Sequence, residues 1–593
     1  MSVIDHPAGE SRLLPMTALA ILVGLGGGFV AEGLLALIHL ITNIAFRGQV
    51  SFANQPPTTD RFGLWIIVVP VIGGLIVGVM ARWGSPAIRG HGIPEVMDSV
   101  LHNDSRIPVR ITALKPISAA IAIGTGGPFG AEGPIIATGG AIGSLLGQIT
   151  HVTADERKTL LAAGAAAGMS ATFGTPVAAV LLAVELLLFE YRARSIIPVA
   201  LASSAAAAVR LALVGNAPVF PMPDVSEPTG TALATYVLLG GLIGAVAVGI
   251  TKAVYAVEDG FERLPIHWMW WPALGGVAVG ALGFIDPGIL GVGYSNITAA
   301  LSGQLAIATL AMLVGLKFVA WAIALGSGTS GGTLAPLFTF GSGLGAIAGV
   351  LLAAHFPELG IAPPVAALVG MAATFAAASR ALLASVVFAF ETTRQPLGLL
   401  PLLAGCSGAY LVSRLMMRHS IMTEKLARRG VLIQEDYAVD YLARLTVASA
   451  MAHPARMLQS NETVVAARVA IEGPDSATHQ GFPVVDGDRL IGVITRRDFA
   501  GAKPDALVGS LVRRAAAVIH PDNSLRDAAD TMVREGVGRL PVVARNAPTL
   551  VLGIITRSDL LRAHAPRLVA AEHRTRKMKL EEFGPHFFNR HPQ

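Results

Sequence analysis

Between about Met16 and about Thr423 the chain carries long apolar runs with few ionisable residues. Three runs approach the roughly 20 residues that a helix needs to cross a bilayer: Leu64–Ala81, Leu233–Val254 and Leu397–Ser413. Other runs are shorter or are interrupted by Gly and Pro. Lipid tolerates an interrupted helix only where its freed backbone groups face protein or a water-filled cavity. The pattern therefore predicts a transporter or channel rather than a simple anchor.

The composition agrees with a membrane protein. Of the 593 residues, 53% are hydrophobic and only 14% are charged, whereas a soluble globular domain carries about 25% charged residues. The net charge of +5 could suggest nucleic acid, but we expect no such partner, because the basic residues gather where the apolar part ends. They are Arg394, Arg414, Arg418, Lys425, Arg428 and Arg429. The positive-inside rule places this end in the cytoplasm, and we expect a prokaryotic inner membrane.

The start of the chain and its single cysteine exclude other features. Residues 1–15 contain Asp5 and Glu10 and lack the basic segment of a secretory signal, so we predict a cytoplasmic N-terminal tail. Cys406 is the single cysteine, which excludes both an intrachain disulfide and a cysteine metal site. We predict no metal site.

The apolar part contains an internal repeat. Gly164–Glu185 (GAAAGMSATFGTPVAAVLLAVE) aligns without gaps with Gly370–Glu391 (GMAATFAAASRALLASVVFAFE), and both segments close with a Glu. Further landmarks precede them, because Pro134, Gly139 and Gly143 match Pro336, Gly341 and Gly345. Two related halves of about 200 residues are typical of transporters with inverted-topology repeats, where broken helices meet at the substrate site. We predict halves at about 16–215 and about 230–425.

Three segments combine Gly and Pro in apolar surroundings: GHGIPE (Gly90–Glu95), GTGGPFGAEGP (Gly124–Pro134) and GSGTSGGTLAP (Gly326–Pro336). Proline suits the first turn of a helix, and glycine lets the backbone approach a ligand closely. Helix N-termini carry unpaired N–H groups and about half a positive charge, so several of them aimed at one point form an anion site. Glu132 lies in one of these segments, and an ionisable residue at membrane depth is a functional candidate.

With these motifs the chain resembles the CLC family of chloride channels and chloride/proton antiporters. GHGIPE is similar to the family's GSGIPE, GAEGP to GREGP and GGTLAP to GxFxP, in matching order from about residue 16 to about residue 425. The resemblance implies an all-α polytopic membrane fold of about 18 tilted or partial helices with inverted-topology repeats. It also implies a homodimer with one anion pathway in each subunit. Glu132 would be the external gating glutamate, whose carboxylate occupies an anion site until it is protonated or displaced.

The resemblance also implies a set of anion-binding residues. They are His91, Gly92, Ile93, Gly130, Ala131, Gly133, Leu334, Ala335 and Met422. Several of them depart from the family pattern, since His91 replaces a serine, Met422 stands at or near a tyrosine, Leu334 replaces a phenylalanine and Ala131 an arginine. The backbone amides of Gly92, Ile93, Leu334 and Ala335 can face an anion whatever their side chains are.

Two nearby side chains have alternative interpretations. His91 either contacts the anion, in which case acidification strengthens binding, or turns away and caps a helix. Lys115 stands where the family has a lysine that raises the positive potential of the pore. The alternative for Lys115 is a side chain that snorkels toward the membrane surface.

Three further acidic positions bear on proton coupling. For Glu185 and Glu391 we expect a structural role, with backbone or arginine partners such as Arg380. Exchangers of the family carry a second glutamate directly after the one that corresponds to Glu185, and this chain has Leu186 there. Glu190 is the nearest substitute, but five residues along a helix would move it by about 7.5 Å. We therefore favour a passive, voltage- or proton-gated chloride channel, with an antiporter that uses an atypical proton path as the alternative.

The C-terminal part has a soluble pattern that occurs twice, in GFPVVDGDRLIGVITRRD (481–498) and GRLPVVARNAPTLVLGIITRSD (538–559). Each copy predicts a strand, a turn, a second strand beginning at Gly492 or Gly553, and a helix opened by Thr-x-x-Asp. Helical patterns precede both copies, near Val464–Ile471 and Leu525–Glu535. The pattern resembles a pair of cystathionine-β-synthase (CBS) motifs, that is, an α/β cytoplasmic domain.

A CBS pair implies a regulatory role, with adenine nucleotide (ATP, ADP or AMP) as a possible ligand and no required cofactor. The residues that would hold the phosphate and ribose are Thr495, Asp498, Thr556 and Asp559. The alternative is that these side chains only cap helices. The predicted domains are 1–15 (tail), 16–425 (membrane domain), 426–444 (linker), 445–503 and 504–564 (CBS motifs), and 565–593 (basic tail).

Two other functions have weaker support in the sequence. A divalent-cation transporter needs a cluster of acidic residues that faces a cavity, whereas only Glu132, Glu185 and Glu391 lie deep in the apolar part. A nucleotide-sensing enzyme on a membrane anchor needs a nucleophile with its base or a metal cluster, and the soluble part shows neither. We therefore expect chloride or another small anion as the substrate, a lipid bilayer as the environment, and no enzymatic activity.

Overall fold

The computed structural model describes residues 12–58, 63–430, 441–472 and 480–566. It contains two compact units, one formed by residues 7–437 and one that begins at residue 438. The predicted boundaries at 15, 425, 444 and 564 stay predictions. Most of the predicted linker and of both tails lies outside the described residues, but helix α1 begins at Leu13, within the predicted N-terminal tail.

The first unit is helical and is built twice from the same series of elements. The first series is α1 (Leu13–Arg47), α2 (Val68–Val79), α3 (Ile93–His102), α4 (Val109–Gly124), α5 (Glu132–Ile149), α6 (Ala154–Phe173), α7 (Pro176–Ala183) and α8 (Ala193–Leu213). The second series is α9 (Gly230–Glu262), α10 (Trp271–Ile285), α11 (Tyr294–Leu301), α12 (Ile307–Gly326), α13 (Leu334–His355), α14 (Pro363–Ser379), α15 (Leu382–Thr393) and α16 (Leu399–Met416). The matching order confirms the predicted repeat.

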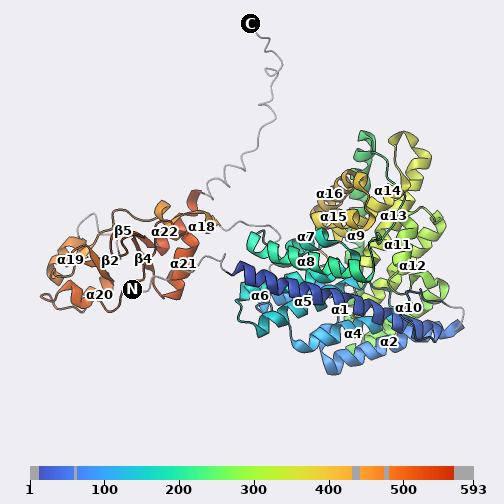
Figure 1. Ribbon diagram of the computed structural model, residues 1–593, viewed down its shortest axis with the longest axis horizontal. Helices are drawn as coiled ribbons and strands as arrows, with labels where there is room; N and C mark the ends of the chain where they lie inside the picture. The colour runs from blue at the N-terminus through green and yellow to red at the C-terminus, as the bar shows by residue number, and fades with distance from the viewer. Residues whose placement is uncertain (1–11, 59–62, 431–440, 473–479, 567–593) are drawn as a thin grey trace, which may run out of the picture. The chain divides into compact units, whose positions relative to one another are not determined.

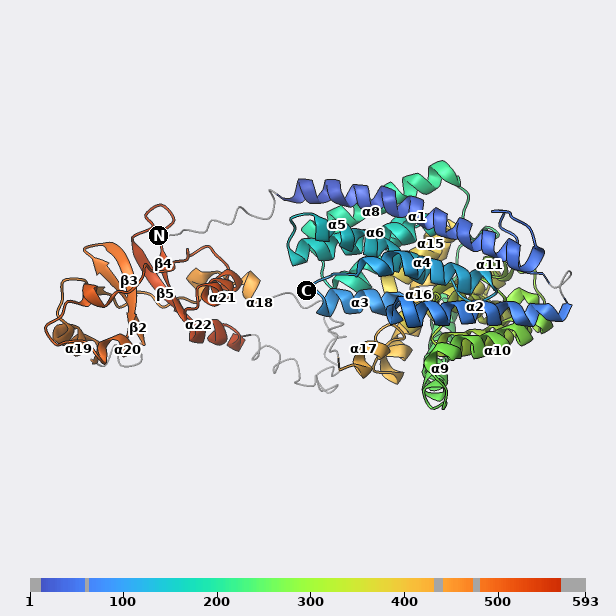
Figure 2. The same cartoon turned by 90° about the horizontal axis from the view of Figure 1, so that it is seen from below.

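The described part of this unit holds seventeen α-helices, because the short α17 (Glu424–Arg428) follows the repeat. This number agrees with the expectation of about 18. Eight helices are long and apolar enough to cross a membrane, and shorter apolar helices lie among them. The blue-to-cyan helices of the first half and the green-to-yellow helices of the second half pack against each other (Figures 1 and 2). The protein is therefore a multi-pass membrane protein.

The glycine landmarks of the repeat mark places where two helices touch backbone to backbone. In the first half, a Cβ at Gly139 on α5 would overlap with the carbonyl of Gly164 on α6. In the second half, a Cβ at Gly341 on α13 would overlap with the carbonyl of Gly370 on α14. Only glycine permits this approach, so close helix packing explains why these landmark positions are glycine.

The two halves cap each other's helices through the carboxylates that close the repeat segments. Glu185 lies in the π-helical segment η4 (Val184–Leu188) after α7, and it accepts hydrogen bonds of 3.0 Å from the backbone N–H groups of Leu383 and Ala384 at the start of α15. Glu391 on α15 accepts bonds of 3.1 and 2.8 Å from the N–H groups of Val177 and Ala178 at the start of α7. The predicted structural role, with backbone partners, is confirmed.

The suggested partner Arg380 has other contacts. Its guanidinium donates to the carbonyl oxygens of Arg418 and Met417, which lie after α16. Arg380 itself ends α14 in a left-handed conformation with a φ of 61°. The helix N-terminus, rather than an arginine, therefore supplies the donors for these carboxylates.

The second unit contains two small sheets. The first sheet has the order β1-β2-β3, with β1 (Leu458–Gln459) parallel to β2 (Gly481–Asp486) and β2 antiparallel to β3 (Arg489–Thr495). The second sheet pairs β4 (Arg539–Val543) with β5 (Val551–Thr556) in antiparallel orientation. The helices of the unit are α18 (Tyr441–Arg444), α19 (Val464–Glu472), α20 (Arg496–Phe499), α21 (Leu525–Arg534) and α22 (Arg557–Arg562).

Each copy has the predicted strand, turn, strand and helix, but the second strands begin earlier than predicted. β3 starts at Arg489 and β5 at Val551, so Gly492 and Gly553 lie inside their strands. Both glycines sit next to a shift in strand register, where a side chain has no room: a Cβ at Gly492 would overlap with the side chain of Val512. These glycines mark β-bulges rather than strand starts.

We expect Glu391→Gln to lower the free energy of unfolding by about 1–3 kcal/mol, because the α7 amides would lose a charged acceptor. The measurement is the thermal unfolding midpoint of the purified protein in detergent. Glu358→Gln serves as the control, since Glu358 is exposed. Equal midpoints for both variants would contradict a stabilising role for the reciprocal caps.

Candidate functional site

Interrupted segments from both halves meet at the centre of the helical unit. Gly130 and Gly332 exchange backbone hydrogen bonds, with the N–H of Gly130 3.1 Å from the carbonyl of Gly332 and the N–H of Gly332 2.8 Å from that of Gly130. This pair joins the loop before α5 to the loop before α13. A second contact joins the halves where the N–H of Gly331 approaches the carbonyl of Gly90 at 3.5 Å. The predicted convergence of broken helices is therefore present.

A fourth interrupted segment completes the centre, and the sequence analysis missed it. GVGYSN, residues 291–296, stands in the second half where GHGIPE stands in the first. The glycines of both turns have positive φ angles, 93° at Gly90 and 97° at Gly92, and 65° at Gly291 and 77° at Gly293. The Gly-x-Gly spacing directly before a short helix was the signal that could have found this turn.

Each of these two turns is held by a buried lysine. Nζ of Lys115 on α4 donates to the carbonyl oxygens of Ile88 and Gly90, both at 2.8 Å. Nζ of Lys317 on α12 donates to the equivalent carbonyls of Ile289 and Gly291, at 3.1 and 3.2 Å. Both side chains are almost fully buried, so Lys115 does not snorkel.

Glu132 is the first residue of α5 and is completely buried. Its Oε1 accepts a hydrogen bond of 2.7 Å from the hydroxyl of Tyr294. Its Oε2 lies over the joined loops, where it occupies the position that a Cβ at Gly130 would take. The backbone N–H groups of Glu132 and Ala335 face the carboxylate, although Oε2 has no hydrogen bond of good geometry within the described residues.

The carboxylate of Glu132 thus lies where the N-termini of α5 and α13 converge. Leu334 is the first residue of α13, and Leu334, Ala335 and Ala131 are buried around this point. The carbonyl of His91 lies against Gly133, whose Cα has no room for a Cβ. Leu334 and Ala335 open α13, and the predicted role of their backbone amides in facing an anion stays a prediction.

His91 lies in the turn before α3 and is buried, yet its ring makes no hydrogen bond with the described residues. The helix-capping alternative is wrong, because Oε2 of Glu95 caps α3 by accepting a bond of 2.8 Å from the N–H of Gly92. The same bond occupies the amide of Gly92, which was predicted to face an anion. At this N-terminus the amide of Ile93, the first residue of α3, remains as the predicted donor.

His91 lines a cavity of about 510 Å³. Charged side chains around this cavity include Lys115, Lys425 and Arg89, balanced in part by Glu95 and Glu258. The Lys425 ammonium group lies 3.6 Å from Oε1 of Glu95. The cavity therefore connects these charged side chains with His91, which lies next to the central loops.

Met422 is fully buried, next to a turn that also borders the cavity. The neighbouring Ile421 donates its N–H to the carbonyl of Ala378 and accepts, at 2.9 Å, a hydrogen bond from the hydroxyl of Tyr255 on α9. A tyrosine hydroxyl is thus present near this turn, but it comes from another helix and is bonded to backbone. The sequence analysis did not identify Tyr255.

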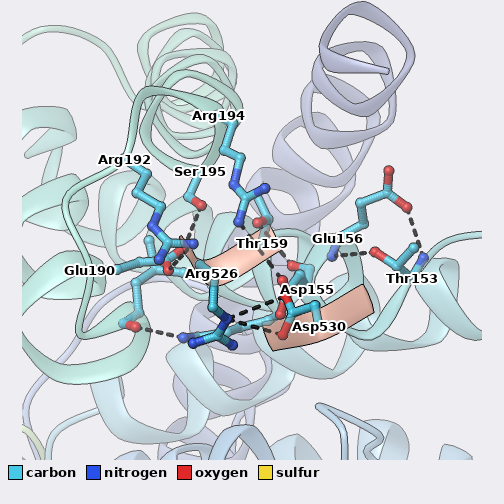
Figure 3. A network of polar contacts seen from close by, with 12 residues as sticks. Thr153, Asp155, Glu156, Thr159, Glu190, Arg192, Arg194, Ser195, Arg526 and Asp530 are labelled. Carbon is cyan, nitrogen blue, oxygen red and sulfur yellow. Dashed lines mark hydrogen bonds and ion pairs between the residues drawn. The ribbon is translucent and has the colours of Figure 1, made fainter. Parts of the chain in front are cut away.

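Glu190 does not lie on the helix that carries Glu185. The π-helical segment η4 ends at Leu188, and Phe189 adopts a left-handed conformation with a φ of 52°. The predicted displacement along a continuous helix is therefore wrong. Glu190 accepts a hydrogen bond of 2.6 Å from Ser195 and lies 3.6 Å from Arg192, as Figure 3 shows. Leu186 is buried.

In the second unit, both Thr-x-x-Asp motifs form helix caps. Thr495 donates through Oγ1 and through its N–H to Oδ2 of Asp498, at 2.6 and 2.7 Å, and Thr556 makes the same pair of bonds to Asp559, at 2.7 and 2.9 Å. Burial raises the pKa of Asp498, but the hydrogen bonds from Thr495 outweigh it and hold the pKa below its ordinary value. These contacts agree with the capping alternative. Other atoms of the motifs face the cavities beside them.

Two cavities adjoin these caps. The smaller one, of about 230 Å³, is lined by Thr495 and Arg514. The larger one, of about 510 Å³, is lined by Thr556 and Asp559 together with arginines that the sequence analysis missed: Arg456, Arg539, Arg557 and Arg562. Arg539 lines both cavities, and its Nη1 is buried without a hydrogen-bond partner among the described residues.

Comparisons with known proteins find the same two parts. A family model described as "Voltage gated chloride channel" matches residues 73–414, and a "CBS domain" model matches residues 447–505 and 508–565. The H(+)/Cl(-) exchange transporter ClcA of Vibrio parahaemolyticus is 31% identical over 69% of this chain and 89% of its own length. Chloride channel protein CLC-f of Arabidopsis thaliana is 32% identical over 64% of this chain, and the match spans about half, 52%, of the plant protein.

Solved structures share the fold. A slow cyanobacterial Cl-/H+ antiporter has a TM-score of 0.63 at 24% identity, covering 70% of this chain and 97% of the antiporter. A eukaryotic CLC transporter has a TM-score of 0.59 at 22% identity, covering 92% of this chain and 98% of that chain.

Proposed function

Since this chain belongs to the family of voltage-gated chloride channels and carries two CBS domains, we propose that it passes chloride or another small anion across a membrane, with Glu132 as the gate. The observation that carries this proposal is the position of the Glu132 carboxylate. It lies at the converging N-termini of α5 and α13, facing the amide of Ala335. A carboxylate is itself an anion, so a buried site that holds it also suits chloride.

The proposed pathway runs from the charged cavity through His91 to Glu132. The ring of His91 has no partner among the described residues and borders the cavity, so it is placed to contact an anion that enters there. Lys115 lies beside it and supplies positive potential while fully engaged with backbone carbonyls. Gly92 contributes no amide in this arrangement, so the inner site depends more on the His91 side chain.

We favour passive conduction on the evidence of the residues beyond Glu185. Leu186, Leu187 and Leu188 are buried and carry no group that binds a proton, and Glu190 is engaged by Ser195 and Arg192. Chloride/proton exchange is the second candidate, and two observations favour it. Relatives such as ClcA are exchange transporters, and Glu258 borders the cavity, where it could supply a proton by an atypical path.

The assembly and orientation are part of the proposal. We propose a homodimer in a prokaryotic inner membrane, with the CBS pair in the cytoplasm. The basic side chains after the last span, Arg418, Lys425 and Arg428, support this orientation. The divalent-cation alternative gains no support, because no three His, Cys, Asp or Glu side chains gather at one point within the described residues.

For the CBS pair we propose adenine nucleotide as the ligand of the larger cavity. Thr556 and Asp559 line it, and Asp559 is placed to accept hydrogen bonds from a ribose. Arg456, Arg539 and Arg557 line the same cavity, and the guanidinium group suits phosphate oxygens. The smaller cavity at Thr495 has fewer basic groups, and Asp498 is not among its lining residues, so we propose that it is the weaker site.

We expect Glu132→Gln to make anion flux faster and largely independent of pH, because the amide mimics the protonated carboxylate and cannot ionise. The measurement is chloride efflux from liposomes across acidic to neutral external pH. Tyr294 and Lys317 also face Glu132 and remain in the variant, so any residual pH dependence is assigned to them or to His91. Unchanged pH dependence would remove Glu132 from the gate.

A chloride gradient at equal pH on both sides distinguishes the two transport modes. We expect no uphill proton movement, followed with a proton electrode, because Leu186 cannot carry a proton. Proton movement that reverses with the chloride gradient would establish exchange instead. In that case Glu258→Gln tests whether the cavity carboxylate supplies the protons.

We expect ATP to raise the unfolding midpoint of the full-length protein more than adenosine does. Asp559→Ala should weaken both ligands, whereas Arg557→Ala should weaken ATP by about tenfold and leave adenosine unaffected, because a hydrogen bond to a charged group is worth about 1.5–3 kcal/mol. Arg534→Ala is the control, since Arg534 is exposed on α21. No shift with ATP, ADP or AMP would leave the CBS pair as a scaffold.

A further inference from the structure

A side chain outside the three recognised motifs holds the proposed gate. The hydroxyl of Tyr294 donates a hydrogen bond of 2.7 Å to Oε1 of Glu132. Tyr294 is the first residue of α11, so it comes from the half of the repeat that does not carry Glu132. A hydroxyl that donates to an ionised carboxylate forms one of the stronger hydrogen bonds in proteins.

The position of this hydroxyl is fixed from two sides. On one side, Lys317 ties down the turn before Tyr294 through the carbonyls of Ile289 and Gly291. On the other side, the tyrosine ring packs edge-on against Phe173 and Phe220, with ring centroids 5.6 and 5.8 Å away. The hydroxyl is therefore aimed at Glu132 rather than sampling other positions.

These aromatic neighbours leave the hydroxyl dependent on the carboxylate. Within the described residues, Glu132 is its one hydrogen-bond partner. If the carboxylate swings out of the pathway before an anion takes its place, the hydroxyl is left unpaired in apolar surroundings, and a buried donor without a partner raises the free energy of that state. The bond therefore favours the position in which Glu132 occupies the pathway.

The two halves of the repeat differ at this point. The first-half turn at Gly90 and Gly92 is tied by Lys115 in the same way, but the residue after it, at the start of α3, is Ile93. An isoleucine has no hydroxyl to donate. The two turns share their lysine and glycines, and of the residues that open α3 and α11 only Tyr294 has a side-chain hydroxyl that donates to Glu132.

Resting on the proposed anion transport, we propose that Tyr294 is a latch: a positioning residue that holds the Glu132 carboxylate in the pathway, with Lys317 as its support. The latch sets how readily the gate opens, whereas the anion itself meets backbone amides and His91. Tyr294 thereby links the second half of the repeat to a gate that the first half carries.

The test is Tyr294→Phe in the full-length protein, reconstituted into liposomes. Phenylalanine keeps the ring packed against Phe173 and removes only the hydroxyl. We expect chloride efflux at neutral pH to rise about tenfold, as the loss of one hydrogen bond to a charged group implies. Tyr236→Phe is the matched control, because its buried hydroxyl accepts a hydrogen bond of 3.4 Å from the backbone N–H of Ala362, the residue before α14, away from the gate. Its efflux should be unchanged.

The same substitution made in a protein that lacks the Glu132 carboxylate separates the latch from a general effect on folding. In Glu132→Ala there is no carboxylate to release, so adding Tyr294→Phe should change efflux by less than about twofold. Lys317→Met keeps the tyrosine but frees its turn, and it should raise efflux in the same direction as Tyr294→Phe. Unfolding midpoints in detergent accompany all variants.

The outcomes are distinguishable. If Glu132→Ala raises efflux and Tyr294→Phe does not, the latch is overturned while the gate stands. If Tyr294→Phe has the same effect with and without Glu132, the hydroxyl acts independently of the carboxylate and the latch is again overturned. If no variant and no wild-type protein passes chloride or another small anion, the proposed function fails and the latch fails with it.

Discussion

The structure of the membrane unit depends on one backbone contact, the reciprocal pair of hydrogen bonds between Gly130 and Gly332. It forms where two chain segments that cannot be helical cross inside an apolar interior, and there every N–H and C=O must find a partner. Each loop satisfies the other, so neither half can complete its centre alone. The contact also demands glycine at Gly332, because a Cβ there would overlap with the backbone carbonyl of Gly130. The helix N-termini of α5 and α13 converge as a consequence of this crossing.

Three glutamates of the helical unit show how hydrogen bonding distinguishes a structural carboxylate from a functional one. Glu185 and Glu391 each accept two backbone N–H groups at a helix start, so both oxygens are occupied and the side chain is fixed. Glu132 accepts one hydroxyl, and its second oxygen has no hydrogen-bond partner among the described residues. A half-bonded carboxylate at a site of positive potential can be replaced there by another anion. The residue type is the same, so the difference lies in the number of donors and in burial, because Glu132 is fully buried whereas Glu185 and Glu391 are partly exposed.

The repeat, the three motifs and Glu132 could be predicted because glycine, proline and glutamate landmarks recur at matching positions in one sequence. The turn at Gly291 was missed because its signal is weaker: only the Gly-x-Gly spacing repeats, and the Pro and Glu of GHGIPE become Ser295 and Asn296. Tyr255 and Tyr294 were missed since nothing in a sequence shows which helices face each other. Glu190 was misplaced because periodicity assumes a continuous helix, whereas the chain leaves it after Leu188. The arginines of the CBS cavity come from separate segments and share no spacing.

The exchange of helix caps between Glu185 and Glu391 has a consequence for the evolution of such a chain. Each half supplies the carboxylate that caps a helix of the other half. An ancestral single half could therefore have been completed by a second copy of itself. Fusion of the two copies needs only a connection from Leu213 to Gly230, which leaves both caps in place. After fusion the copies could diverge at positions outside these caps, the shared glycine contacts and the two buried lysines. One copy could then keep the gating glutamate while the other acquired a tyrosine beside it.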